Sequence, residues 1–416
     1  MLTVAPPTPR EFLILTVLFV LLYVFNTVQP PELIVDALTN STAFLTGPRP
    51  LHADAHLVWG PHAVPNTKIV AHVPGWTVLD KLYVHRGIAY IVTDTPTTIP
   101  ALHFIYSKGH NILSGHIGET ERMPTEEDIR IISTKEAQKL FGTSAQLIDG
   151  VTVCGLFAEI DCLLIGFLSF LSMIPLSCTC SVDALANDSQ FSSITHYYHW
   201  AAELWFGFWR AYSSLDPAIT SDGRTTLPPL RRIWFNRVDS AHWRDYASMN
   251  QWVILASFPS VTMEFMYDWQ DRAQMERPFV FERVVLADRS AAMYSYNYAR
   301  FQRTAAAAFA LPGSADWWLP IRNNVVGFAG IGPDVGQGTR GKPVITYISR
   351  QGWGRRMLIP EDHERLVTEL YKLRDQHGYE VNIVETEKMS RVDQIKLAAR
   401  TTVRPLNVLP LASCEC

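Results

Sequence analysis

This 416-residue chain has no large excess of positive or negative residues, and most of its length contains no cysteine. Lys and Arg total 36 against 40 Asp and Glu, which gives a net charge of -4. Without a polybasic signature, the chain is not expected to bind nucleic acid. The apolar fraction of 48% and the charged fraction of 18% indicate a packed globular protein, long enough for two domains with additional segments.

The cysteines are confined to two short stretches and show no zinc-site spacing. Cys178 and Cys180 are too close for a CxxC pair, and no CxxC pair follows them. We therefore expect no metal site, although some of these thiols could form disulfides in an oxidising compartment. The six residues are Cys154, Cys162, Cys178, Cys180, Cys414 and Cys416.

Long apolar runs are equally scarce, and the clearest one lies near the N-terminus. Residues 12–28 are apolar except for two threonines and one asparagine, at the short limit for a transmembrane helix. A cleaved signal peptide is the rival interpretation, but Gln29-Pro30-Pro31 is a poor cleavage site. We favour an uncleaved signal-anchor that follows a cytoplasmic tail at residues 1–11. The expected protein is a single-pass type II membrane protein.

Two sequons follow this segment, at Asn40 and Asn187. Both are candidate N-glycosylation sites, which favours a lumenal body in the endoplasmic reticulum or Golgi. The apolar run within 162–176 is too short for a second span. Residues 29–60 contain several Pro and Thr residues and are expected to form a stem.

Short strands and helices alternate from residue 61 to residue 332, which predicts an α/β domain. A hairpin is expected where His85-Arg86-Gly87 separates two apolar runs. Aromatic residues at every fourth position predict a helix over 195–213. Further helices are expected over 125–141 and 243–258, and strands over 232–235 and 281–286.

A Gly-rich connection at residues 333–342 is the best domain boundary, and a clear β-α-β-α-β pattern follows it. The first helix is expected to begin near Pro360 and to end at Gly378, and Ser390 is expected to cap the second. Such a unit predicts a parallel sheet that binds a ligand at the carboxyl ends of its strands. The three strands are expected at 344–349, 380–384 and 401–403.

Three arginines follow the first strand of this unit. Arg350 lies at its carboxyl end, and Arg355 and Arg356 lie in the next loop. Guanidinium groups at such a crevice suit a diphosphate, because each donates parallel hydrogen bonds to phosphate oxygens. A solvated basic loop is the alternative interpretation.

Several segments together resemble glycosyltransferase family 61, most closely its fungal branch. THYYHWAAEL is similar to the second motif of the family, in which a His within an aromatic run precedes a carboxylate by four residues. The C-terminal segments are similar to the catalytic domain of the family. They read VITYISRQGWGRRML (344–358), DHERLVTEL (362–370), GYEVNIVETEKMS (378–390) and DQIKLAARTTV (393–403).

The resemblance implies a GT-B-like α/β fold with two facing Rossmann-type domains, of which the C-terminal one (343–403) is incomplete. It further implies a UDP-sugar donor, a glycan or glycoprotein acceptor, and transfer with inversion. No tightly bound cofactor is expected, and a metal ion is not expected to be required, because arginines can neutralise the departing diphosphate.

The resemblance also assigns roles to individual residues. Arg350 binds the donor diphosphate, and Arg355 and Arg356 support it; Ser349 and Glu387 complete the nucleotide-sugar site, with Glu387 near the nucleoside. His199 and Glu203, one helical turn apart, are the candidates for acceptor contact or for the general base of an inverting transfer. The alternative is that His199 is a core-facing polar residue with Glu203 as its partner.

Two stretches depart from the family pattern, at residues 154–194 and 404–416. No glycine occurs after Gly378, so the glycine loop that the family places after the third strand is missing. A retained intron and a shifted reading frame are our hypothesis for the two stretches. The alternative function is therefore a catalytically inactive, truncated relative that acts as a lumenal binding protein.

Overall fold

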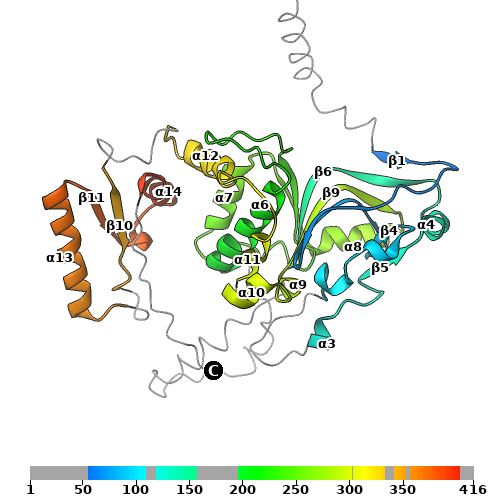
Figure 1. The fold of residues 1–416 in the computed structure, drawn as a ribbon, viewed down its shortest axis with the longest axis horizontal. Helices are drawn as coiled ribbons and strands as arrows, with labels where there is room; N and C mark the ends of the chain where they lie inside the picture. The colour runs from blue at the N-terminus through cyan, green and yellow to red at the C-terminus, as the bar shows by residue number, and fades with distance from the viewer. Residues whose placement is uncertain are drawn as a thin grey trace, which may run out of the picture. The chain divides into compact units, whose positions relative to one another are not determined.

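The computed structural model describes residues 55–108, 119–156, 195–301, 303–332, 342–352 and 357–402 (Figure 1). The chain divides into two compact units, Met1–Ala55 and His56–Cys416, and every element discussed below belongs to the second. Several predicted features lie outside the described residues. They are the apolar segment 12–28, Asn40, Asn187, most of the stretch 154–194, Arg355, Arg356 and the tail 404–416.

The larger sheet runs in the order β5-β4-β3-β9-β6-β7-β8, with β1 paired to β6 and β2 paired to β3. Its pairing is mixed: β3 is antiparallel to β2, β4 and β9, whereas β6 is parallel to β9 and β7. The strands are β1 (His56–Val58), β2 (Lys68–Val73), β3 (Trp76–His85), β4 (Ile88–Val92), β5 (Ile129–Ile132), β6 (Ser144–Leu156), β7 (Leu230–Trp234), β8 (Thr262–Glu264) and β9 (Phe279–Asp288).

This sheet corrects the predicted fold class. Two Rossmann-type domains require parallel sheets, but the predicted hairpin at Arg86-Gly87 forms, and a two-residue hairpin can join only antiparallel strands. Both turn residues adopt a positive φ, 51° for Arg86 and 79° for Gly87. The membrane helix of the predicted fold is not supported either. Among the described residues, no helix is long and apolar enough to cross a membrane.

A second correction concerns residues 125–141, which were expected to be helical throughout. Ile129–Ile132 instead forms strand β5, parallel to β4, and only Thr134–Phe141 is helical. The isoleucines of this stretch suit a pleated surface better than a helix. Ser133 caps the helix in a capping box with Glu136, which fixes its start.

Aromatic side chains join the helices to the larger sheet. Trp76 is fully buried, and its indole N–H donates to the Thr304 carbonyl at 3.0 Å. A Cβ at Gly207 would lie 2.3 Å from the Trp76 ring, so only glycine permits this approach. The helices of this region are α3 (Glu119–Arg122), α4 (Thr134–Phe141), the π-helix η5 (His199–Trp205), α6 (Phe206–Ser213), α7 (Met249–Ser257), α8 (Met266–Gln274), α9 (Arg289–Ala292), α10 (Tyr296–Phe301), α11 (Thr304–Ala308) and α12 (Leu319–Phe328).

The first residues of the stretch 154–194 belong to the sheet. Cys154 lies in β6 opposite Leu286 of β9 and is fully buried. Burial raises the pKa of its thiol well above the ordinary value. The neutral thiol therefore packs as a small apolar side chain in the core that contains Trp234 and Phe281.

Asp288, at the end of β9, ties a distant loop to the sheet. Its carboxylate accepts the Ser107 N–H at 2.6 Å and the Ala291 N–H at 2.8 Å. Burial nevertheless raises its pKa from 3.8 to about 6, because the charged form is cut off from water.

The titration of Asp288 should make the protein more stable in mild acid than at neutral pH. The folded pKa lies above the unfolded one, so the folded state holds the proton between pH 4 and pH 6. The free energy of unfolding is expected to fall by on the order of 3 kcal/mol across that window. Urea titrations of the wild type and of Asp288→Asn check this. An equal decrease in the variant would contradict the assignment.

The C-terminal elements form the predicted parallel unit. β10 (Val344–Ile348) pairs in parallel with β11 (Glu380–Val384). α13 (Pro360–His377) ends at Gly378 with φ 65°, and Ser390 caps α14 (Arg391–Arg400) by accepting the Asp393 N–H. The predicted helices and the first two strands are therefore confirmed. A 3-10 turn, η7 (Thr386–Lys388), links β11 to α14, and two others, η1 (Pro96–Thr98) and η2 (Leu102–Phe104), follow β4.

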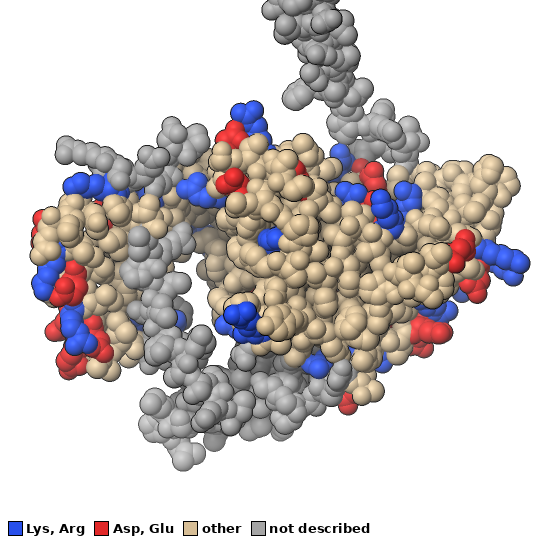
Figure 2. All heavy atoms as spheres, viewed as in Figure 1, with Lys and Arg blue, Asp and Glu red and all other residues tan. Residues whose placement is uncertain are grey.

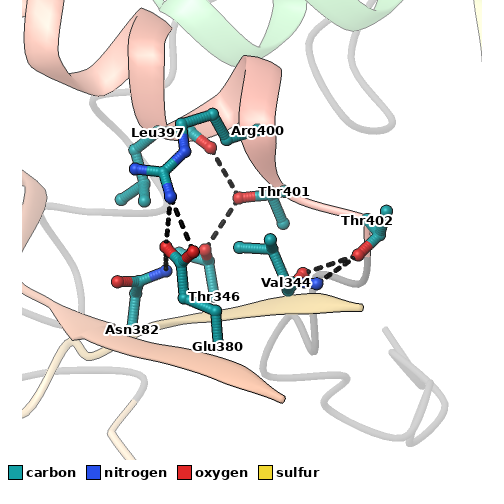
Figure 3. Close-up of polar contacts among 8 residues, drawn as sticks. All are labelled: Val344, Thr346, Glu380, Asn382, Leu397, Arg400, Thr401 and Thr402. Carbon is teal, nitrogen blue, oxygen red and sulfur yellow. Dashed lines mark hydrogen bonds and ion pairs between the residues drawn. The ribbon is translucent and has the colours of Figure 1, made fainter. Parts of the chain in front are cut away.

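The chain after α14 returns to the free edge of β10 (Figure 3). The Val344 N–H donates to Thr402 Oγ1 at 2.5 Å, and the Thr402 N–H donates to the Val344 carbonyl at 2.9 Å. The Ser349 N–H donates instead to the Val384 carbonyl of β11. Ser349 is an odd number of residues from Val344, so the backbone groups of the two residues point to opposite edges of the strand. Because backbone groups of a strand point alternately to its two edges, Thr402 and β11 lie on opposite edges of β10.

This order places helices on both faces of the small sheet. α13 packs with Tyr347 and Ile345 on one face, whereas Thr401, after α14, bonds Thr346 on the other at 2.7 Å. The described residues assign two strands to this sheet, β10 and β11, and in open α/β sheets ligands bind at the carboxyl ends of the strands. Ser349 and Arg350 follow β10 at that point.

Candidate active site

Two groups of residues predicted from the sequence fall at two places in the structure. The first lies at the start of η5, where His199 and Glu203 face each other. The second lies at the carboxyl ends of β10 and β11. A pocket lined by Tyr197 and by residues of both strands connects these regions.

Glu203 forms an ion pair with Arg289 and also contacts His199. His199 Nδ1 lies 3.4 Å from Glu203 Oε1, and Arg289 Nε lies 3.2 Å from Glu203 Oε2. The side chain of Glu203 is only 3% exposed and that of Arg289 14%, whereas His199 is 22% exposed. Glu203 is therefore too deep to contact an acceptor, and His199 is the most exposed of the three side chains.

The charge state of Glu203 follows from these contacts. Burial by itself raises the pKa of this carboxyl, but the His199 contact and the charge of Arg289 outweigh it, so the pKa is lowered. Glu203 is thus a carboxylate at neutral pH. It favours the His199 tautomer with a proton on Nδ1 and a lone pair on Nε2.

Local structure explains how the three side chains meet. η5 brings His199 and Glu203 to one side, and Arg289 follows directly after β9, whose last residue, Asp288, caps α9. Arg289 was missed by sequence reasoning. It is 86 residues from Glu203 in the chain, and no sequence spacing indicates that the end of β9 lies beside η5.

The residues around the Arg350 loop are only partly described. Ser349 is buried, and its N–H donates a hydrogen bond to the Val384 carbonyl at 2.8 Å. Arg350 is half-buried directly after it. Glu387, on the exposed turn η7, faces this loop, because a Cβ at Gly352 would lie 3.9 Å from Glu387 Oε1 and from Glu385 Oε2. The structure therefore brings Glu387 near the loop that contains Arg350.

The pocket has a volume of about 540 Å³, within the range of small-molecule sites. Ile348, Val384 and Thr386 line it at the carboxyl ends of the small sheet. Ser349, Arg350 and Glu387 lie next to this wall rather than in it. The remaining lining residues come from β10, from the α7, α12 and α14 regions, and from the residues that flank η5 and α14. They are Tyr197, Ala247, Met249, Val253, Trp318, Ile321, Arg322, Val325, Val326, Thr346, Met389, Gln394, Ile395, Leu397, Ala398, Ala399 and Thr401.

Arg322 supplies a positive charge to this largely apolar wall. Its Nη2 lies 3.4 Å from the Ala399 carbonyl at the end of α14. Gln394, also on the wall, donates from Nε2 to the Thr386 carbonyl at 2.9 Å. Sequence reasoning missed both residues, because neither occurs in a recognisable motif.

The described residues contain no group of three or more His, Cys, Asp or Glu side chains that could hold a metal ion. Comparison with known proteins adds no assignment: no protein-family model matches the chain, and no curated protein matches it.

Proposed function

We propose that this protein is a glycosyltransferase of the family 61 type, which transfers a sugar from a UDP-sugar to a glycan or glycoprotein acceptor with inversion, in the lumen of the endoplasmic reticulum or Golgi. The observation that supports this best is the 540 Å³ pocket. It joins the carboxyl ends of a parallel βα unit to Tyr197, two residues before His199.

His199 is the proposed general base. In an inverting transfer the acceptor oxygen attacks the anomeric carbon, and the bond from that carbon to the diphosphate oxygen breaks with its electron pair. The acceptor proton passes to His199 Nε2. Glu203, which contacts Nδ1 at 3.4 Å, orients the ring and balances the imidazolium charge, while Arg289 holds Glu203 in place.

Arg350 is the proposed diphosphate ligand, because its guanidinium can donate two parallel hydrogen bonds to phosphate oxygens. It follows β10 at the carboxyl end of a parallel strand, where a nucleotide diphosphate is expected in a doubly wound unit. The uridine and the sugar would then extend along the pocket wall formed by Ile348, Val384 and Thr386.

UDP binding by the full chain tests this proposal without requiring turnover. Calorimetry should detect binding of UDP, and Arg350→Ala should weaken it by about tenfold or more, since a charge-assisted hydrogen bond is lost. Lys372→Ala is the matched control, because this exposed lysine on α13 pairs with Glu369 away from the pocket. Equal affinity of the wild type and Arg350→Ala for UDP would contradict the proposed role of Arg350 in binding the diphosphate. Binding without transfer would support the alternative, a non-catalytic binding protein.

A further inference from the structure

We infer that Gln394 reads the base of the nucleotide: its amide oxygen accepts the N3–H of uracil and so selects UDP over CDP. This inference rests on the proposed function, because it names the residue that sets the base specificity of the same site. It depends on the direction of the hydrogen bonds along the pocket wall that β10, β11 and α14 form.

The side-chain amide of Gln394 is held in one orientation. Gln394 is half-buried in α14 and lines the pocket, as do Thr386 and Met389 of the segment before this helix. Its Nε2 donates to the Thr386 carbonyl at 2.9 Å and to the Met389 carbonyl at 3.2 Å. Both partners are acceptors, so the atom that contacts them must be the amide nitrogen, and each of its two protons has a partner. Oε1 is the atom left for a ligand, and it can only accept.

Two threonines that bond each other on this wall have the same polarity (Figure 3). Thr401 Oγ1 donates its proton to the Leu397 carbonyl at 2.6 Å. The 2.7 Å contact between Thr346 Oγ1 and Thr401 Oγ1 is therefore a donation from Thr346. Both hydroxyl protons are used within the wall, so these side chains, like that of Gln394, offer a ligand only lone pairs. A ligand that bonds them has to supply the proton.

Uracil and cytosine differ in this respect at the same ring position. Uracil has a proton on N3, whereas cytosine has a lone pair there. In the same pose, cytosine would place its N3 lone pair against Gln394 Oε1, which leaves both groups without a hydrogen bond. Because the amide is already fixed by Thr386 and Met389, it cannot turn to offer a proton instead. Such a fixed polar group rejects the wrong ligand more strongly than an apolar contact does.

The position of Gln394 suits a base rather than a phosphate. The Ser349 N–H donates to the Val384 carbonyl at 2.8 Å, so the carboxyl ends of β10 and β11 lie side by side. A nucleotide whose diphosphate is bound by Arg350, after β10, can therefore extend to the turn after β11, to which Gln394 is bonded. Ile348 and Val384 line the pocket there, and such apolar side chains suit the flat face of a base.

The test measures the affinity of the full chain for three nucleotides by calorimetry. They are UDP, CDP and N3-methyl-UDP, which keeps both carbonyls of uracil but has a methyl group in place of the N3 proton. UDP should bind about tenfold more tightly than either of the others, since each lacks the N3–H. Equal affinity for UDP and CDP, or for UDP and N3-methyl-UDP, would overturn the inference. These measurements need only the wild-type protein.

A variant assigns the difference to Gln394. Gln394→Met keeps the length of the side chain but has no amide oxygen, so the ratio of UDP to CDP affinity should fall close to one. The ratio is the readout, because loss of the bonds to Thr386 and Met389 would weaken both nucleotides alike. An unchanged ratio in this variant would contradict the role of Gln394.

Gln376→Met is the matched control. Gln376 is exposed on α13, over which charged side chains of both signs gather (Figure 2), and none of the described pocket-lining residues comes from that helix. This variant should keep the wild-type ratio. Thermal unfolding monitored by circular dichroism verifies that both variants fold.

Further outcomes distinguish failure of this inference from failure of the proposed function. If all three nucleotides bind equally well and Arg350→Ala weakens them all, the base site fails and the diphosphate site stands. If UDP is preferred, Gln394→Met removes the preference and no UDP-sugar is turned over, the base site stands and the enzyme proposal fails. Absence of binding by any of the nucleotides would contradict both.

Discussion

Replacing His199 by Ala is expected to lower kcat by roughly 100- to 10,000-fold, the usual contribution of a positioned base. The reason is geometric: among His199, Glu203 and Arg289, the side chain of His199 is the most exposed, at 22%. The KM for the UDP-sugar should change little, since the donor is proposed to bind at the β10 loop. Initial rates at varied donor and acceptor concentration measure both constants.

His196→Ala is the matched control for that variant. His196 is an exposed histidine of the same segment, with its ring centroid 5.1 Å from that of His199, but it is not assigned to the ion pair. Its removal should leave kcat within a few-fold of the wild type. If both alanine variants lose turnover equally, or if neither does, His199 is not the base.

Replacing Glu203 by Gln is expected to lower the free energy of unfolding by about 3–5 kcal/mol, the usual cost of breaking a buried ion pair. The amide leaves the charge of Arg289, which is 14% exposed, without its carboxylate. The same change removes the group that orients His199, so kcat should fall as well. Urea unfolding followed by tryptophan fluorescence gives the stability.

Two comparisons make the Glu203 prediction specific. Glu369→Gln breaks the exposed pair with Lys372 and should cost less than about 1 kcal/mol. The double variant Glu203→Leu with Arg289→Met removes both charges and should recover most of the stability. If the double variant is as unstable as Glu203→Gln, the loss does not come from an unpaired charge.

The contribution of Glu203 to the free energy of unfolding changes with pH in the opposite direction to that of Asp288. The pKa of Glu203 is lowered in the folded protein, so its contribution to stability is present above the unfolded pKa and is lost as pH falls through the folded one. Asp288, with a raised pKa, contributes more when protonated. Measuring Glu203→Gln and Asp288→Asn across the acid range separates the two groups.

Local signals were enough to predict the C-terminal elements. Proline at the start of α13, glycine at its end and Ser390 before α14 are capping residues that act within a few positions. The hairpin at Arg86-Gly87 was predictable for the same reason. The pairing of His199 with Glu203 also follows from local geometry, because a helical turn brings residues four apart together.

Long-range pairing could not be predicted in this way. The strand at Ile129–Ile132 was expected to be helical, and its conformation is decided by pairing with β4. The antiparallel contact of β3 with β9 joins residues about two hundred positions apart, and it is what makes the larger sheet mixed. The alternation of apolar and polar side chains shows which face of a strand is buried. It does not identify the strand that pairs with it or whether the pairing is parallel or antiparallel.

The sequence by itself determined the caps, the turns, the βα unit and the His199–Glu203 spacing, because each depends on residues close together in the chain. Only the tertiary structure decided that Arg289 completes the ion pair and that Arg322 and Tyr197 line one pocket with Val384. Those groups come from separate strands and helices, and they meet because burial of apolar side chains such as Trp76 brings the segments together.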